Sequence, residues 1–308
     1  MTAPYRAPWW LPGGHLQTLY AALAPAPRVA WRRERWETPD GDFIDLDQAG
    51  ERGPLLALFH GLEGSSASHY ARGIAARAAA RGWRCVVPHF RGCSGVPNRL
   101  PRAYHSGDSD EVGFILQKLL ERSEILHAIG VSLGGNALLK WLGEQGDAAA
   151  RVLRRAAAVS APIDLAATGH ALDRGFNKQL YTRFFLATLK PKALEKLARF
   201  PGYVPEGRVR AASTLREFDD AVTAPLHGFR GADDYWARAS CAPWLERVRV
   251  PTLLLNARND PFLPAPALER VPRGHSHLVL EFPRGGGHAG FPGRDGWLAR
   301  RVLEFLGT

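Results

Sequence analysis

The chain has 308 residues, 45% of them hydrophobic, and a formal net charge of +10. This length and composition suit one large core with an insertion, and no Gly/Ser-rich, Pro-rich or charge-block linker divides the chain. The three cysteines are odd in number and form no C-x-x-C pattern, which argues against a disulfide framework. The basic residues are scattered and form no run, so nucleic acid is not expected as a partner. A solvated basic surface explains most of this charge, and peripheral contact with an anionic membrane surface is the alternative.

The N-terminal stretch does not resemble a targeting segment. It lacks a basic region followed by an apolar one, and no apolar run in the chain reaches the length that crosses a bilayer. We therefore expect a cytoplasmic protein, whose oligomeric state the sequence does not indicate.

Strands and helices alternate in the first half of the chain. A β-hairpin is predicted over residues 31–48, around the turn Pro39-Asp40-Gly41. There follow strands over 54–60, 83–90, 124–131 and 155–160, and helices over 68–81, 106–122 and 133–144. The strands read as continuous apolar runs, which is typical of strands buried on both faces. The pattern predicts the α/β class with a mostly parallel, doubly wound sheet.

The alternation stops at residue 163 and resumes near residue 251. Strands are predicted over 252–255 and 277–282, with helices over 266–271 and 297–306. The segment between is helical and aromatic and contains no convincing strand. The expected organisation is a core formed by residues 1–162 and 248–308, with residues 163–247 as a helical cap over the carboxyl edge of the sheet, where ligands bind in such folds.

A serine stands at a position typical of a catalytic nucleophile. Gly130-Val131-Ser132-Leu133-Gly134 fits the G-x-S-x-G pattern, and it follows an apolar strand and opens a helix. That strand–turn–helix context is the nucleophile elbow, in which a sharp turn holds the serine at the sheet edge. The pattern is weak alone and specific in this context, and the alternative is an ordinary tight turn.

A serine hydroxyl needs a base, and the base needs an orienting acid. In this fold the chain order is serine, acid, histidine. His288 lies in a glycine-rich loop between the last predicted strand and the last helix, which makes it the predicted base. The other histidines after the serine lie in the insertion or in a polar turn, namely His170, His227, His275 and His277.

Asp260 is the predicted acid, because it ends a strand at the same sheet edge as the serine. Its main rival is Asp164, which reads better as a helix N-cap. The oxyanion hole requires two backbone N–H donors. We expect one from Leu133, directly after the nucleophile, and one from Leu62 in the loop His60-Gly-Leu-Glu-Gly64. His60 precedes the serine and is interpreted as a residue that organises this loop.

Taken together, these motifs resemble the YheT-type (EMB8-like) branch of the α/β-hydrolases. The resemblance runs nearly end to end, through stretches that include 9–18, 60–64, 89–95, 104–107, 130–136, 218–228, 259–262 and 286–288. It implies Ser132, Asp260 and His288 as the triad, the same set that the chain order predicts. It also implies carboxylic-ester substrates with short- to medium-chain or lipid-like acyl groups.

The resulting hypothesis is a serine esterase that acts through an acyl-enzyme and needs no cofactor or metal. The pocket candidates are His60, Phe184, Phe185 and Trp236, although packing inside the cap would equally explain the aromatic residues. One alternative is an acyltransferase that uses the same acyl-enzyme. Another is a non-catalytic module that binds a small apolar ligand, and an intact triad would argue against it.

Overall fold

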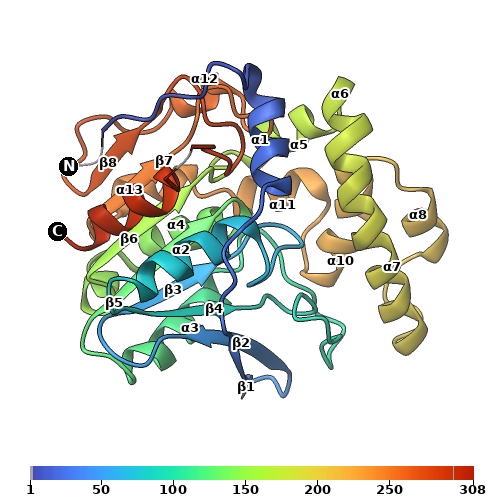
Figure 1. The fold of residues 1–308 in the computed structure, drawn as a ribbon. Helices are drawn as coiled ribbons and strands as arrows, with labels where there is room; N and C mark the ends of the chain where they lie inside the picture. The colour runs from blue at the N-terminus through green and yellow to red at the C-terminus, as the bar shows by residue number, and fades with distance from the viewer. Residues whose placement is uncertain (1–2, 294) are drawn as a thin grey trace.

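Eight strands form one sheet in the order β1-β2-β4-β3-β5-β6-β7-β8 (Figure 1). This computed structural model describes residues 3–293 and 295–308. The strands are β1 (Arg32–Glu37), β2 (Phe43–Ala49), β3 (Leu55–Phe59), β4 (Arg84–Pro88), β5 (Leu126–Val131), β6 (Arg155–Val159), β7 (Thr252–Leu255) and β8 (Leu278–Glu281). The pairs β1–β2 and β2–β4 are antiparallel, and all other neighbours are parallel. The predicted fold class is confirmed.

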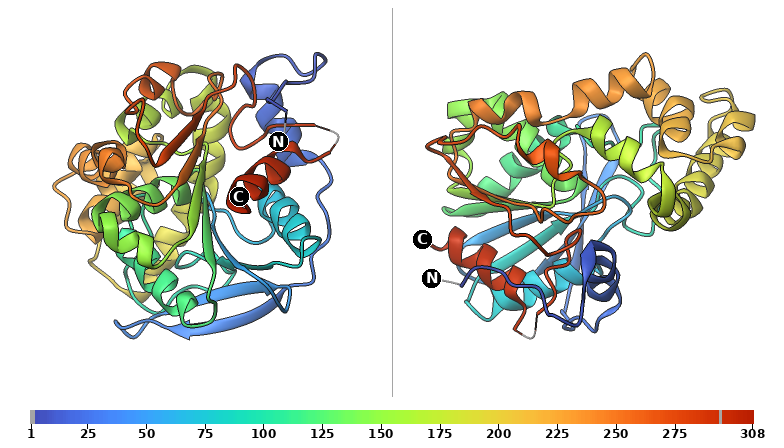
Figure 2. Two further views of the ribbon diagram at one scale, coloured as in Figure 1. Left: turned by 90° about the vertical axis from the view of Figure 1, so that its left-hand side faces the viewer. Right: turned by 90° about the horizontal axis from the view of Figure 1, so that it is seen from above.

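Both faces of the sheet are covered, as the apolar runs predict. In β3, Leu56 and Leu58 pack on one face while Ala57 and Phe59 pack on the other. Helices α2 (His69–Ala79) and α13 (Trp297–Leu306) cover the first face. Helices α3 (Ser109–Leu120) and α4 (Leu133–Gln145), the turns η1 (Gly146–Arg151) and η4 (Ala242–Arg247), and the short α12 (Ala265–Leu268) cover the second. Figure 2 shows this three-layer arrangement from two further sides.

The order of the strands fixes where two important loops meet. Strand β3 pairs on one side with β4, the next strand in the sequence, and on the other side with β5. Phe59 of β3 lies opposite Gly130 of β5. The chain leaves both β3 and β5 at the same carboxyl edge, so the loop after β3 lies against the turn after β5. This is the switch point at which doubly wound sheets bind ligands.

The residues between β6 and β7 are helical. They form α5 (Leu165–Leu172), α6 (Gly175–Asn177), the π-helical turn η2 (Lys178–Thr182), α7 (Arg183–Arg199), α8 (Glu206–Ala211), α9 (Leu215–Phe218), the π-helical turn η3 (Asp219–Thr223), α10 (Ala224–Leu226) and α11 (Ala232–Ala239). They gather beyond one edge of the sheet (Figure 1). The last part differs, because Leu245 of η4 packs in the core with α4. We call residues 165–239 the lid.

A helix near the N-terminus has no counterpart in the prediction. Helix α1 (Gly13–Leu23) buries Gly14, Gln17, Thr18 and Ala21 and exposes Leu16, Tyr20 and Leu23. Its buried face is therefore small and polar and its exposed face is apolar. This reverses the usual amphipathic pattern, on which helix prediction depends.

Candidate active site

Ser132 occupies a strained turn between β5 and α4. Its backbone has φ 53° and ψ −123°, a conformation that costs a non-glycine residue roughly 1–3 kcal/mol. The turn is tight because a Cβ at Gly130 would lie 2.4 Å from the Gly134 carbonyl oxygen. A Cβ at Gly134 would lie 2.5 Å from the Phe59 carbonyl oxygen. The two flanking glycines of the motif are thus required by backbone packing, and the surrounding sheet holds the serine in its strained position.

The structure brings the three predicted catalytic residues into one chain of hydrogen bonds. Ser132 Oγ lies 2.8 Å from His288 Nε2, so the hydroxyl can donate to an imidazole that is protonated on its other nitrogen. His288 Nδ1 lies 2.9 Å and 3.1 Å from the two carboxylate oxygens of Asp260. Phe262 stacks on the imidazole, with ring centroids 3.9 Å apart. The rival Asp164 caps α5 instead, where its side chain accepts from the Ala167 amide.

Helix α1 fixes the loops that carry Asp260 and His288. The Thr18 hydroxyl accepts from the His288 amide at 2.8 Å and donates to the Gly14 carbonyl at 2.7 Å. Gln17 Oε1 accepts from the Gly286 amide at 2.7 Å and from the Asn259 side chain at 3.0 Å. The buried polar face of α1 is therefore a support for His288. Neither residue is predicted from the sequence as part of the site, although both end the 9–18 stretch that carries part of the family resemblance.

A second support comes from the end of β6. Ser160 has φ 50°, and its hydroxyl accepts from the amide of Ala289, the residue after His288, at 2.9 Å. His69 on α2 lies 3.1 Å from the Ala289 carbonyl oxygen. Burial lowers the pKa of His69, so the imidazole is neutral and donates one N–H here. The His288 loop is thus held on both sides.

The loop after β3 leaves one amide unused. The Gly61 amide donates to Tyr70 Oη, the Glu63 amide to Tyr104 Oη and the Gly64 amide to the Gly61 carbonyl. Within the described residues the Leu62 amide has no acceptor. Leu133 is the first residue of α4, so its amide also lacks a helical acceptor. A Cβ at Gly61 would lie 3.1 Å from the Ser132 Cβ, which shows how close this loop is to the serine.

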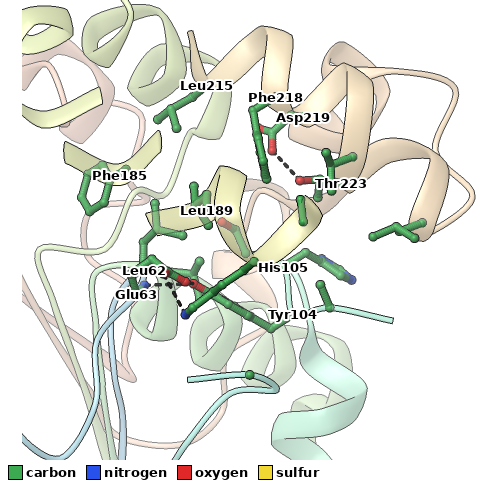
Figure 3. A pocket seen from close by; sticks show the side chains of 18 of the residues that line it. Leu62, Glu63, Tyr104, His105, Phe185, Leu189, Leu215, Phe218, Asp219 and Thr223 are labelled. Atoms are coloured by element: carbon green, nitrogen blue, oxygen red, sulfur yellow. Dashed lines mark hydrogen bonds and ion pairs between the residues drawn. The ribbon is translucent and has the colours of Figure 1, made fainter. Parts of the chain in front are cut away.

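A cavity of about 290 Å³ lies between the lid and the core and reaches Ser132 and His288. Figure 3 shows Leu62, Glu63, Tyr104 and His105 on the core side, facing Leu215, Phe218 and Asp219 of the lid. Most of the lining is apolar, with Leu165, Leu172, Leu189, Val222, Leu226 and Phe262 among its residues. The cavity is therefore mainly apolar around the serine, although charged side chains such as Glu63, Lys192 and Lys196 also line it.

Two of the predicted pocket residues line this cavity and two do not. Phe185 and Trp236 are on its wall. Phe184 is 66% exposed and lies outside the lining, although its ring packs edge-on against that of Phe185, with ring centroids 6.0 Å apart. His60 is fully buried beneath the loop, where its Nδ1 lies 2.8 Å from the Gly61 carbonyl and its Nε2 accepts from the Phe90 amide. Phe184 and His60 therefore do not contribute to the wall of this cavity, and the loop-organising interpretation of His60 agrees with its contacts.

The cavity also contains polar atoms that have no partner. Thr168 Oγ1 and His227 Nε2 are buried and make no hydrogen bond within the described residues. His227 packs edge-on against His105, with ring centroids 4.5 Å apart. Burial lowers the pKa of His105 and of His227 to about 3, so both imidazoles are neutral at pH 7. His105 and His227 therefore contribute no charge to the cavity wall.

Ionic contacts from α7 hold the lid against the core. Lys192 Nζ lies 2.8 Å from Oε2 of Glu63, the residue after the Leu62 amide. One turn further on, Lys196 donates to Asn98 Oδ1 at 2.6 Å and to the Arg102 carbonyl at 2.7 Å. Burial lowers the pKa of Lys196 to about 8. These contacts fix α7 to the loops that follow β3 and β4.

Comparison with known proteins identifies the family. A family model described as the alpha/beta hydrolase fold matches residues 54–293. The Escherichia coli (strain K12) protein YheT is 38% identical over 96% of this chain and 90% of its own length. The chain is a YheT-like member of the α/β-hydrolases. Human phospholipase ABHD3 is 30% identical, over 99% of this chain and 79% of its own length.

Solved structures of this family share the fold. An esterase from Exiguobacterium antarcticum superposes with a TM-score of 0.59, covering 90% of this chain and 100% of that one, at 17% identity. Among residues 3–293 and 295–308 of this α/β-hydrolase, no helix combines the length and the apolar character needed to span a bilayer. The same residues contain no group of three or more His, Cys, Asp or Glu side chains arranged to hold a metal ion.

Proposed function

We propose that this chain is a serine esterase that cleaves carboxylic esters through an acyl-enzyme. The observation that carries the proposal is the continuous set of hydrogen bonds from Ser132 Oγ through His288 to Asp260. His288 takes the serine proton while Oγ attacks the ester carbonyl. Asp260 keeps the imidazole in the required tautomer and stabilises its charged form. His288 then returns the proton to the leaving alcohol, and water releases the acyl group by the same steps.

The charge that develops on the carbonyl oxygen is assigned to two backbone donors, the Leu62 and Leu133 amides. Both are free of other acceptors, and both belong to segments held rigidly by the sheet. Donors that need no reorganisation during the reaction account for a large share of such rate enhancements, roughly 10²–10³ each. In this assignment Glu63 contributes by position only, since its ion pair with Lys192 holds the loop beneath the lid.

The substrate class follows from the lining of the cavity. About 290 Å³ is small for a ligand pocket, and most of the lining is apolar, with leucine and phenylalanine its most frequent large side chains. A short- to medium-chain acyl group would fit, and residues 163–247 would act as the cap that encloses it. Relatives named as a phospholipase and a monoacylglycerol lipase support an ester of lipid type.

Labelling with a fluorophosphonate probe tests the nucleophile. Wild type should become labelled, Ser132→Ala should not, and p-nitrophenyl ester turnover by the variant should fall about 10⁴–10⁶-fold. A wild type that binds apolar esters but takes no label would refute the enzyme proposal in favour of a binding module. If the label is taken, the p-nitrophenyl series from acetate to palmitate measures the acyl length. Product analysis with added methanol separates hydrolysis from acyl transfer.

A further inference from the structure

The outer surface of α1 is an apolar face that nothing in the protein covers. Leu16, Tyr20 and Leu23 are spaced i, i+4 and i+7, so they form one stripe along the helix. Trp9 and Trp10 precede the helix, and Trp10 packs edge-on against Tyr20. Trp9 is 92% exposed and Leu23 is 83% exposed. Transfer of each such side chain from water to an apolar medium is favourable by up to about 1.5–3 kcal/mol. An exposed stripe of this kind therefore indicates a binding surface.

The lid extends this face. Phe176 of α6 is 58% exposed and packs edge-on against His15 of α1, with ring centroids 4.8 Å apart. His15 also stacks on Tyr181 of the lid, which in turn contacts Phe262. We define the outer apolar face as Trp9, Trp10, Leu16, Tyr20, Leu23 and Phe176. These are six of the eleven large hydrophobic residues exposed in the described part of the chain. The exposed apolar surface is thus concentrated beside the catalytic loops.

The charges without an ion-pair partner in the segments that carry this face are positive. In residues 3–31 the only charged side chains are Arg6 and Arg28, and both are exposed. Phe176 is flanked by Arg174 and Lys178, and none of these four cations forms an ion pair within the described residues. The nearby Asp173 is occupied, because its carboxylate accepts from the amides of residues 215 and 216. The face therefore combines apolar side chains with unpaired positive charge.

We propose that the outer apolar face docks this protein on the surface of an anionic lipid bilayer. Tryptophan and tyrosine prefer the headgroup level, where a ring can be apolar on one side and hydrated on the other. Arginine and lysine are attracted to the negative potential of anionic lipids, and apolar contact together with basic charge provides the two signals that stable peripheral binding requires. The buried face of the same helix holds His288 through Thr18, so docking would bring the catalytic edge to the lipid.

Vesicle flotation tests this docking surface. Wild type should float with phosphatidylcholine vesicles that contain 30% phosphatidylglycerol at 50 mM NaCl, and binding should fall steeply at 500 mM NaCl. Trp9→Ser with Leu23→Ser should weaken the partition coefficient at least tenfold. The matched control is Ile125→Ser with Val279→Ser, which removes exposed apolar groups elsewhere and should leave binding unchanged.

The charge is tested in the same assay. Arg174→Gln with Lys178→Gln should reduce binding by about 25-fold, roughly fivefold for each cation. Arg81→Gln with Arg151→Gln removes two exposed cations elsewhere and should have little effect. Equal binding by wild type and the apolar double variant would overturn the proposal. So would a dimer that this double variant dissociates in sedimentation equilibrium, with no vesicle binding by wild type, because the face would then be a contact between two copies.

The outcome does not depend on the proposed catalysis. Fluorophosphonate labelling of Ser132 in vesicle-free buffer should be the same in wild type and in all four double variants, since none of the changed residues contacts the triad. Failure of labelling would refute the esterase proposal and leave the docking proposal standing. Failure of flotation would refute the docking proposal and leave the esterase proposal standing.

Discussion

Thr18 offers a sharp test of the idea that α1 positions the catalytic histidine. Its hydroxyl accepts from the His288 amide and donates to the Gly14 carbonyl, and the side chain also interacts with the Tyr181 hydroxyl of the lid. Thr18→Val keeps the shape of the side chain but leaves the His288 N–H without an acceptor. An unsatisfied buried donor costs about 1–3 kcal/mol. If the loop relieves that cost by moving, the Nε2–Oγ contact of 2.8 Å lengthens, and each 1.36 kcal/mol lost from the transition state is tenfold in rate.

The expected result is a fall in kcat of about tenfold to 100-fold on p-nitrophenyl butyrate, with a matching fall in the rate of fluorophosphonate labelling. KM should change little, because Thr18 does not line the cavity. Thr18→Ser retains both hydrogen bonds and should restore most of the rate while losing about 0.8 kcal/mol of methyl packing. Urea unfolding of both variants separates positioning from stability. The reasoning is refuted if the valine variant loses stability yet keeps wild-type kcat, or if serine and valine reduce kcat equally.

Further consequences concern the elbow, the lid and the pocket. Gly134→Ala places a methyl 2.5 Å from a backbone oxygen, so it should lower the free energy of unfolding by about 3 kcal/mol and abolish fluorophosphonate labelling. The control Gly73→Ala adds a methyl that meets nothing within 4 Å of it, so it should raise the free energy of unfolding by about 0.5–1 kcal/mol. Burial raises the pKa of Asp219 to about 7, above its unfolded value, so this group lowers stability as pH rises from 4 to 7. Urea midpoints at pH 5 and pH 8 should differ less in Asp219→Asn than in wild type, and equal pH slopes would contradict this. Phe185→Ala should shift the p-nitrophenyl ester preference toward longer acyl chains, and Phe184→Ala should leave it unchanged, since only Phe185 lines the cavity.

The parallel sheet was predictable because its strands are short apolar runs separated by helices of ordinary amphipathic pattern. In β3 every residue from Leu55 to Phe59 is buried, and the run bounded by Gly53 and His60 is already visible in the sequence. The order of Ser132, Asp260 and His288 follows from the same topology, because each residue ends a strand or opens a loop at the carboxyl edge. Their distances could not be predicted, since they depend on residues far apart in sequence, such as Thr18 with His288.

The differences between the predicted pocket residues and the cavity lining have a related cause. Consecutive aromatic residues on a helix point about 100° apart, so Phe184 and Phe185 cannot share one wall. Composition shows that the lid is aromatic, but the direction of each side chain depends on the rotation of α7, which the contacts of Leu186, Lys192 and Lys196 determine. His60 shows the opposite case, because its place at the end of a buried strand already indicated a structural role.

Helix α1 was not predicted because its hydrophobic pattern is the reverse of the one expected for a helix on a protein surface. Pattern analysis assumes that apolar side chains face the core, whereas α1 turns Gln17 and Thr18 inward and Leu16, Tyr20 and Leu23 outward. A polar buried face is costly unless each group is bonded, and here the His288 loop supplies those bonds. An apolar outer face gains nothing in water, so the folded monomer alone does not explain it. The loops that carry Asp260 and His288 account for the inner face of this helix, and the proposed docking on a lipid surface would account for its outer face.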